Sequence, residues 1–166
     1  MPGDGNALIV ATRNDNGTAA RKLIAAGARA DQGFEGDGNG LIVAAAAGDV
    51  RLLGDMLAAG ADVNAAVRGD GNPLIQAARN GHLEAAQLLV GQGADVNLVV
   101  PGDENALIGA AWNGDLDMVN YLLSAGADPT IKVAVPGDGY RSALRQASQA
   151  GHTAIVDALR RAGARE

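Results

Sequence analysis

The sequence predicts an all-α repeat solenoid, in which helix-turn-helix units stack on one another and are joined by β-hairpin-like loops. A glycine-rich acidic phrase, written "PGDGN", "GDGN", "PGDEN" or "PGDGY", recurs at intervals of 33, 33, 33 and 35 residues, and its first glycines are Gly3, Gly36, Gly69, Gly102 and Gly137. A fixed period of this length indicates an array of like units. The composition agrees, because 35 Ala stand against 17 Leu and small side chains favour closely approaching helices.

The third repeat shows the elements of a unit most clearly. Asn72 and Pro73 predict a helix start, since Asn accepts hydrogen bonds from free first-turn amides and Pro suits the first helical position. Asn80-Gly81 ends this helix after about two turns. A second apolar set then has helical spacing, until Gly93 ends the second helix: Leu83, Ala86, Leu89 and Val90. Each unit is therefore a helix pair with one apolar side, which stacking covers.

We expect one repeat domain over residues 1–166, with units at about 1–35, 36–68, 69–101, 102–136 and 137–166. In the last unit, Arg145 and Arg160 replace apolar residues, so we expect this unit to act as the C-terminal cap. The first unit lacks such substitutions and begins inside a loop phrase, from which we expect upstream sequence in the native protein. Its Asp15-Asn16-Gly17 turn predicts that its second helix is the least stable of the array.

The stretch "NPLIQAARNGHLEAAQLLVGQGADVN" resembles an ankyrin repeat. It matches that family's Thr-Pro-Leu-His start, Ala-Ala pair, Gly-His turn and Gly-Ala-Asp-Val-Asn exit, and the resemblance extends over essentially the whole chain. The family's Thr is replaced by residues that can also cap a helix: Asn6, Asn39, Asn72, Asn105 and Ser142. Its His is replaced by Ile9, Ile42, Ile75 and Ile108, where we expect an apolar contact instead of the imidazole's hydrogen bond.

The recurring acidic phrase has three chemical interpretations. A dinucleotide-binding loop reads Gly-x-Gly-x-x-Gly between a strand and a helix, but "GDGNG" at 36–40 has the wrong spacing and no parallel-sheet pattern around it. A calcium loop needs oxygen ligands and a final Glu, whereas Leu41 and Gly48 stand at two of those positions. Asp-Gly is a strong tight-turn signal. We therefore expect the phrase to turn the chain and start the next helix, with its aspartates forming a row of separate charges.

No pattern in the chain predicts catalysis, a metal site or a cofactor. His82 and His152 lie about two units apart in equivalent turns, so we expect a structural role for both. Ser124, Ser142 and Ser148 have no His at a plausible spacing, and the chain has no cysteine. We expect a protein that is not an enzyme.

Charge and hydropathy exclude further classes of partner. Thirteen basic and nineteen acidic residues give a net charge of −6 without a basic face, so we expect no nucleic acid partner. The sequence has no apolar run of about 18 residues and no signal pattern at its start, so we expect no membrane insertion. The absence of cysteine fits a reducing compartment such as the cytoplasm and leaves the compartment open. We expect a monomer.

The resemblance implies that protein partners bind in a concave groove made of first helices and loop tips. Carried over position by position, the candidate protein-binding residues are Arg68, Arg79, Asn80, Glu104, Trp112, Asn113, Tyr140, Arg141 and Gln149. Trp112 is the sharpest candidate, because a Trp beside Arg79 on an exposed groove is a pair that anchors interfaces. Its ring could instead pack on the neighbouring loop, and the sequence leaves both open.

A second function class also remains. The sequence of the loops weakly resembles that of ankyrin-type tails of some bacterial membrane-bound sensor metallopeptidases. The metal-binding motif of those enzymes is missing from this sequence. In that interpretation the array is a structural or regulatory appendage of a larger enzyme or sensor and packs on its own parent chain. In the first interpretation it is a non-catalytic protein-binding module.

Overall fold

The computed structural model describes residues 7–101, 103–135, 137 and 139–165. Within these residues it contains ten helices and a two-stranded sheet. The helices are α1 (Ala7–Arg13), α2 (Gly17–Ala25), α3 (Gly40–Ala47), α4 (Val50–Ala58), α5 (Pro73–Arg79), α6 (Leu83–Gly91), α7 (Ala106–Asn113), α8 (Leu116–Ser124), α9 (Ala143–Ala150) and α10 (Thr153–Arg161). The strands are β1 (Val133–Val135) and β2 (Gly139–Arg141).

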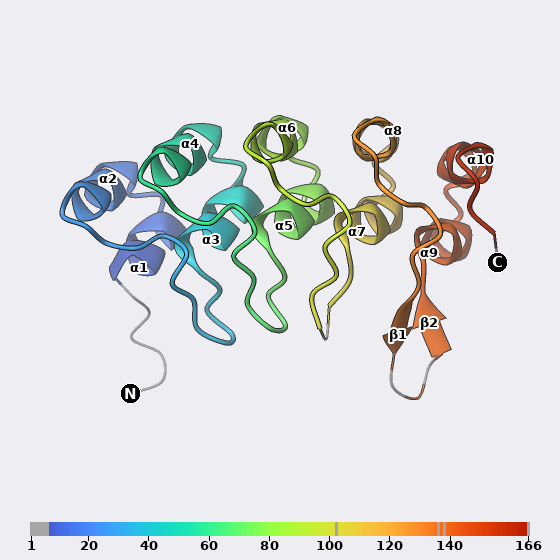
Figure 1. Ribbon diagram of the computed structural model, residues 1–166, viewed down its shortest axis with the longest axis horizontal. Coiled ribbons are helices and arrows are strands. Elements are labelled where there is room, and N and C mark those ends of the chain that lie inside the picture. The colour runs from blue at the N-terminus through green and yellow to red at the C-terminus, as the bar shows by residue number, and fades with distance from the viewer. Residues whose placement is uncertain (1–6, 102, 136, 138, 166) are drawn as a thin grey trace.

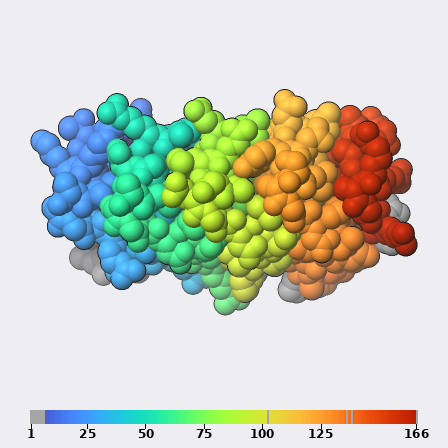
Figure 2. Space-filling view, turned by 45° about the horizontal axis from the view of Figure 1, so that its top comes forward, coloured from blue at the N-terminus to red at the C-terminus, as the bar shows by residue number. Residues whose placement is uncertain are grey.

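The helices form five antiparallel pairs arranged in a row (Figure 1). The odd-numbered helices, which we call the inner helices, lie side by side, and the even-numbered outer helices form a second layer, above them in this view. The loops that enter α3, α5, α7 and α9 extend from the inner layer on one side. In the space-filling view each stretch of sequence forms its own slab along the long axis (Figure 2). The predicted helical repeat stack is confirmed.

The predicted capping residues begin four of the inner helices. Asn39, Asn72 and Asn105 accept hydrogen bonds through Oδ1 from the amides of Ile42, Ile75 and Ile108 at 2.8, 2.8 and 2.9 Å. Ser142 Oγ accepts the Arg145 amide at 3.2 Å in the same way. Each cap satisfies a first-turn donor that has no partner inside the helix. Asn6, the predicted cap of the first helix, lies outside the described residues.

The core is a column of leucines and alanines between successive pairs. One leucine of each inner helix is buried: Leu8, Leu41, Leu74, Leu107 and Leu144. The alanine pairs of α3, α5 and α7 are fully buried between neighbouring inner helices, where a small side chain lets the backbones approach closely. The isoleucines at the family's His position are also buried, as expected for an apolar contact: Ile9, Ile42, Ile75 and Ile108.

The glycine-rich phrase makes the predicted tight turns. Its glycines adopt left-handed φ values, for example 84° and 68° at Gly36 and Gly38, which a side chain would strain. The first two loops close with single bridges between Phe34 and Gly38 and between Val67 and Gly71. The loop that enters α9 is four residues longer than the loop that enters α7, and it forms the antiparallel pair β1 and β2, with Ala134 opposite Tyr140. Gly3 and Gly102 lie outside the described residues.

The aspartates of the phrase make contacts with the preceding unit that the sequence did not predict. Asp70 Oδ2 accepts the backbone amides of Gly36 and Gly38 at 2.8 and 3.3 Å, so it bonds to the turn of the preceding unit. Asp37 accepts a hydrogen bond from Arg13 Nη1 at 3.0 Å across the previous interface. The expected row of separate charges did not include these contacts, through which Asp37 and Asp70 each link their unit to the unit before it. Asp4 and Asp138 lie outside the described residues.

A second set of hydrogen bonds joins the loops that leave the outer helices. Asn64 Oδ1 accepts the Asp95 amide, and Asn97 Oδ1 accepts the Asp128 amide, both at 2.8 Å. Asp31 Oδ2 takes the same role toward the Asp62 amide at 3.2 Å. Neighbouring units are therefore held by polar contacts on both sides of the apolar column.

The second helix of the first unit is fully formed despite its unusual turn. Asn16 caps α2 by accepting the Ala19 amide at 3.0 Å, and Asp15 adopts a φ of 53° to make the turn. Only Ala20 of this helix is fully buried, against three residues in each of α4, α6, α8 and α10. The lower stability expected for α2 stays a prediction, and the small number of buried residues in this helix is consistent with that prediction.

Replacement of Leu74 by Ala tests the stacking register. Leu74 is 1% exposed between neighbouring pairs, so we expect a loss of about 2–5 kcal/mol in the free energy of unfolding, measured by urea denaturation. Val10→Ala is the control, because Val10 lies exposed on α1 and its truncation should cost less than about 0.5 kcal/mol. Equal effects of the two substitutions would contradict the register.

Candidate functional site

A groove pocket of about 580 Å³ lies between the inner helices and loops of the third, fourth and fifth pairs. It is lined by Arg79 from α5, Trp112 and Asn113 from α7, Gln146 and Gln149 from α9, and Glu104 and Arg141 from the entering loops. The accessible groups are an indole, two guanidinium groups and side-chain amides. Trp112 is 56% exposed, so its ring is open to the pocket and not covered by the neighbouring loop.

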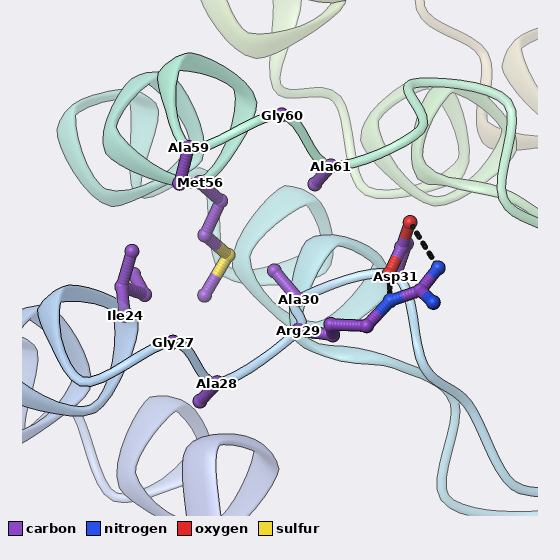
Figure 3. Close-up of a pocket in the computed structure, with 10 residues that line it drawn as sticks. All are labelled: Ile24, Gly27, Ala28, Arg29, Ala30, Asp31, Met56, Ala59, Gly60 and Ala61. Carbon is purple, nitrogen blue, oxygen red and sulfur yellow. Dashed lines mark hydrogen bonds and ion pairs between the residues drawn. The ribbon is translucent and has the colours of Figure 1, made fainter.

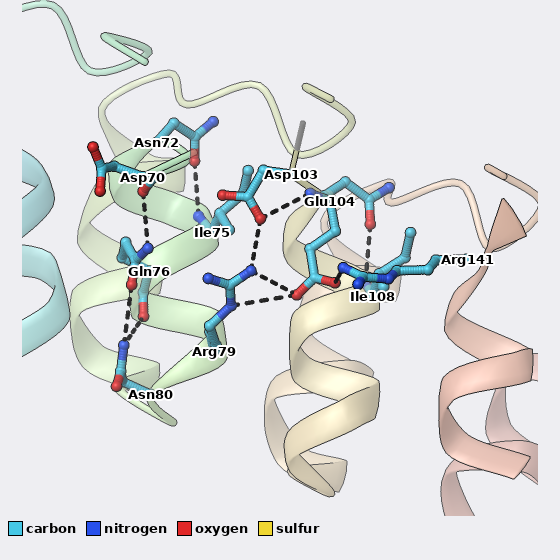
Figure 4. Close-up of polar contacts among 11 residues, drawn as sticks. Asp70, Asn72, Ile75, Gln76, Arg79, Asn80, Asp103, Glu104, Ile108 and Arg141 are labelled. Carbon is cyan, nitrogen blue, oxygen red and sulfur yellow. Dashed lines mark hydrogen bonds and ion pairs between the residues drawn. The ribbon is translucent and has the colours of Figure 1, made fainter. Parts of the chain in front are cut away.

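Arg79 is the central polar group of this pocket (Figure 4). Its Nη2 donates to Asp103 Oδ1 at 2.6 Å, and its Nη2 and Nε donate to Glu104 Oε1 at 3.0 and 3.3 Å. The two carboxylate side chains are only 5% and 7% exposed. On the other side of Glu104, Arg141 Nη1 lies 3.7 Å from Oε2. The guanidinium groups thus cover two buried carboxylates.

The charged state of this cluster follows from its contacts. Burial lowers the pKa of the Arg79 guanidinium, but the hydrogen bond to Glu104 and the charge of Asp103 outweigh burial and raise it above its ordinary value. Asp103 Oδ1 also accepts the Glu104 amide at 3.0 Å, while its Oδ2 is buried without a hydrogen-bond partner among the described residues. Asp103 therefore depends on Arg79 for its neutralisation.

The fourth unit departs from the third at three positions of this pocket. Glu104 stands where the turn has Gly71, Gly109 where α5 has Gln76, and Trp112 where α5 has Arg79, each 33 residues further along the chain. A Cβ at Gly109 would lie 3.4 Å from Glu104 Oε1 and 3.5 Å from Arg79 Cβ. A full Gln side chain there would fill the space that the ion pair occupies. The missing side chain at Gly109 leaves this space free, whereas Glu104 and Trp112 add a carboxylate and an indole to the pocket.

The structure brings six of the nine predicted binding residues into this one pocket: Arg79, Glu104, Trp112, Asn113, Arg141 and Gln149. Glu104 was expected at an exposed loop tip, but its carboxylate is buried under two arginines. Two residues of this region were not among the predicted ones: Gln146, which lies one helical turn before Gln149, and Gly109, whose missing side chain leaves space beside Glu104. Alignment of the repeats carried the Gly109 signal, because other units have Val10, Val43, Gln76 and Gln146 there.

Three predicted residues lie outside the groove pocket. Arg68 is exposed on the second loop, and Asn80 donates to the Gln76 carbonyl at 2.8 Å on the surface of α5. Tyr140 lines an adjacent hollow of about 290 Å³ with Arg145, Ser148 and Gln149. Lys132 Nζ lies 4.5 Å from the centre of the Tyr140 ring, and the Arg145 guanidinium lies 5.3 Å from it. Tyr140 thus holds two cations beside the groove pocket.

The two histidines bond to the backbone of the preceding unit. His82 Nε2 lies 3.0 Å from the Ala46 carbonyl oxygen, and its ring leaves no room for a Cβ at the left-handed Gly48. His152 repeats this arrangement with the Trp112 carbonyl, at 3.3 Å, and with Gly114. These contacts support the structural role expected for both.

The described residues contain neither a metal-binding cluster nor a membrane-spanning helix. No group of three or more His, Cys, Asp or Glu side chains in the described part of the chain could hold a metal ion. None of the helices in that part combines the length and the apolar character needed to cross a bilayer.

A smaller cavity of about 180 Å³ lies between the first and second pairs (Figure 3). Its lining is largely glycine, alanine and Met56, with the Arg29 and Asp31 ion pair at one side. The hydrogen bond from Arg29 holds the pKa of the Asp31 carboxyl below its ordinary value. Ala30 stands where the next units have Val63 and Val96, so the cavity is a packing gap left by a smaller side chain.

The stacked helix pairs, tight turns and capped inner helices define a helical repeat protein of the ankyrin type. A family model described as "Ankyrin repeats (3 copies)" matches residues 41–133, which is more than half of the chain. The chain belongs to the ankyrin-repeat family. A comparison with curated proteins finds no match.

Replacement of Arg79 by Ala should lower stability. It leaves Asp103 and Glu104 buried with fewer donors, so we expect a loss of about 1–3 kcal/mol in the free energy of unfolding, measured by urea denaturation. Arg141→Ala is the matched control, because Arg141 is 47% exposed and should contribute less than about 1 kcal/mol. A stable Arg79→Ala variant would show that the carboxylates find other partners.

Replacement of Ala30 by Val should fill the small cavity. Two added methyl groups that bury against Met56 should raise the free energy of unfolding by about 0.5–1.5 kcal/mol, seen as a higher melting temperature. Ala44→Val is the contrasting variant, because Ala44 is fully buried and borders no described cavity, so that overpacking should destabilise it by about 1–3 kcal/mol. A lower melting temperature for Ala30→Val would contradict the packing-gap interpretation.

Proposed function

We propose that this protein is a non-catalytic recognition module that binds a protein partner in the groove pocket. Ankyrin repeats generally mediate protein-protein interaction, and ankyrin-repeat domains are typically non-catalytic. The observation that carries the proposal is the exposed Trp112 at the pocket of the fourth unit, in a chain with only four aromatic residues. A large, rigid side chain held on a helix between arginines is a common anchor of protein interfaces.

The surrounding framework supports this assignment. Trp112 and Asn113 lie at the C-terminal end of α7, whose other residues are buried in the stack, so the anchor is held by a rigid element. Side-chain amides from α9 and guanidinium groups from α5 and β2 surround it and can adapt their hydrogen bonds to a partner. At the positions equivalent to Arg79 and Asn80, the second inner helix offers only Ala46 and Ala47, and Arg13 of the first is already paired with Asp37. We therefore place the binding surface in the third to fifth units.

Replacement of Trp112 by Ala tests the proposal. Wild-type protein is immobilised, partners are captured from an extract of the cells that produce it, and each partner's affinity is measured with purified protein. We expect Trp112→Ala to weaken binding by about 2 kcal/mol or more with little change in melting temperature, because the side chain is exposed.

Phe34→Ala is the matched control. Phe34 is an exposed aromatic residue on the first loop, outside the groove pocket, so its removal should leave the same partner bound. A partner that Trp112→Ala binds as tightly as wild type does would remove the groove pocket from the proposed function.

A further inference from the structure

We infer that the groove pocket recognises a carboxylate of its protein partner, placed next to a flat apolar side chain that packs on Trp112. This inference rests on the proposed function and adds the chemistry of the partner. It starts from the two arginines of the pocket, which keep donors that the protein itself leaves free.

The free donors are on Arg141 and Arg79. The Arg141 side chain has no hydrogen bond among the described residues, and its closest acidic contact is the 3.7 Å approach to Glu104. Arg79 uses Nε and Nη2 for Asp103 and Glu104, whereas its Nη1 has no acceptor in the described part of the chain. Both side chains line the same pocket as Trp112. A planar carboxylate can pair with such guanidinium edges through two parallel hydrogen bonds.

The accessible charge of this surface is positive although the protein is acidic. The carboxylates at the pocket, Asp103 and Glu104, are buried, whereas Arg79 and Arg141 are 35% and 47% exposed. Lys132 and Arg145 add positive charge beside Tyr140 in the adjacent hollow. A partner that approaches the pocket therefore meets guanidinium groups before it meets any carboxylate.

The acidic residues of this region lie on the opposite side. Between Arg79 and Lys132 the chain has no Lys or Arg, and its exposed acids lie on the outer helices and the loops that leave them: Glu84, Asp95, Asp117 and Asp128. The layer of inner helices, about 10 Å thick, separates these charges from the pocket. That distance is close to the Debye length at physiological salt, so their repulsion of an anion in the pocket is largely screened.

The buried Glu104 decides which anion fits. The two arginines and the two buried carboxylates, Asp103 and Glu104, together carry no net charge. One added carboxylate brings this local charge to −1, whereas a phosphate dianion brings it to about −2. A carboxylate is therefore repelled less, and its planar shape matches the guanidinium edges. It comes from an Asp or Glu side chain or from the chain end of the partner. The Trp112 indole beside it provides a surface for an apolar or aromatic neighbour.

Trp112 also reports on its own pocket, because it is the only Trp of the chain. The experiment follows Trp112 fluorescence and the NMR resonance of its indole N–H while wild-type protein is titrated with capped peptides. The probes are Gly-Gly-Phe-Asp-Gly-Gly and its counterparts with Asn or Lys in place of Asp. Gly-Gly-Phe with a free or an amidated carboxyl end distinguishes a chain terminus from an acidic side chain. We expect the carboxylate peptides to bind at least about tenfold more tightly than their neutral counterparts.

Three variants test the assignment to these residues. Arg141→Gln should weaken binding of the carboxylate peptide by about tenfold, whereas Arg161→Gln, which removes the same charge from the distant α10, should leave it unchanged. Glu104→Gln should strengthen binding several-fold, because it keeps the hydrogen-bond acceptor for Arg79 and removes the competing charge. A role in folding alone does not move these two affinities in opposite directions.

The outcomes separate this inference from the proposed function. Equal binding of the Asp and Asn peptides, or tighter binding of the Lys peptide, would show that the pocket does not select a carboxylate. Trp112 would then remain the anchor of the proposed function. Binding that Arg141→Gln leaves unchanged would overturn the inference as well. If no peptide perturbs Trp112, the inference fails, and the proposed function is still decided by the capture experiment with Trp112→Ala and Phe34→Ala.

Discussion

The structure depends on the burial of apolar surface between successive helix pairs. A single pair has a leucine and an alanine face that it cannot cover by itself, and the next pair covers it, so that Leu41, Leu74 and Leu107 all lie between neighbours. Because the facing residues are largely alanine, the inner helices approach closely. Every other feature of the protein, including the geometry of the groove pocket, is built on this spacing.

Polar contacts across each interface fix how neighbouring units align, which apolar burial alone does not determine. Asp70 bonds the turn of the preceding unit, whereas Asp37 and Asp103, at the same position, bond Arg13 and Arg79 of the preceding inner helix. One aspartate in a repeated phrase thus has two kinds of partner, chosen by the residue on the neighbouring helix. Where that residue is Ala46, the aspartate turns to backbone amides; where it is an arginine, an ion pair forms at the edge of the groove.

Most of the fold could be predicted from the sequence because it repeats. Period, capping residues and turn glycines are local signals, and Asn72 or Gly36 has the role that its residue type favours. The links made by Asp70 and the burial of Glu104 could not be predicted, because they depend on which atoms of neighbouring units meet in space. Six of nine candidate binding residues lie together in the groove pocket, since their positions follow from the register. The alignment of the repeats marks Gly109 as unusual, but the part that Gly109 and Gln146 take in the pocket depends on the room around Glu104, which only the structure shows.

The contacts of this array are short in range along the chain. Substantial contacts join helices of the same pair or of adjacent pairs, so the first pair meets the second and has no such contact with α5 or α7. The groove pocket is built from the third, fourth and fifth pairs. Thermal opening of α1 and α2, where only Ala20 of α2 is fully buried, can therefore occur while Trp112 and its arginines keep their places. Amide protons at the amino-terminal end can exchange rapidly with solvent while a bound partner is retained at the other end.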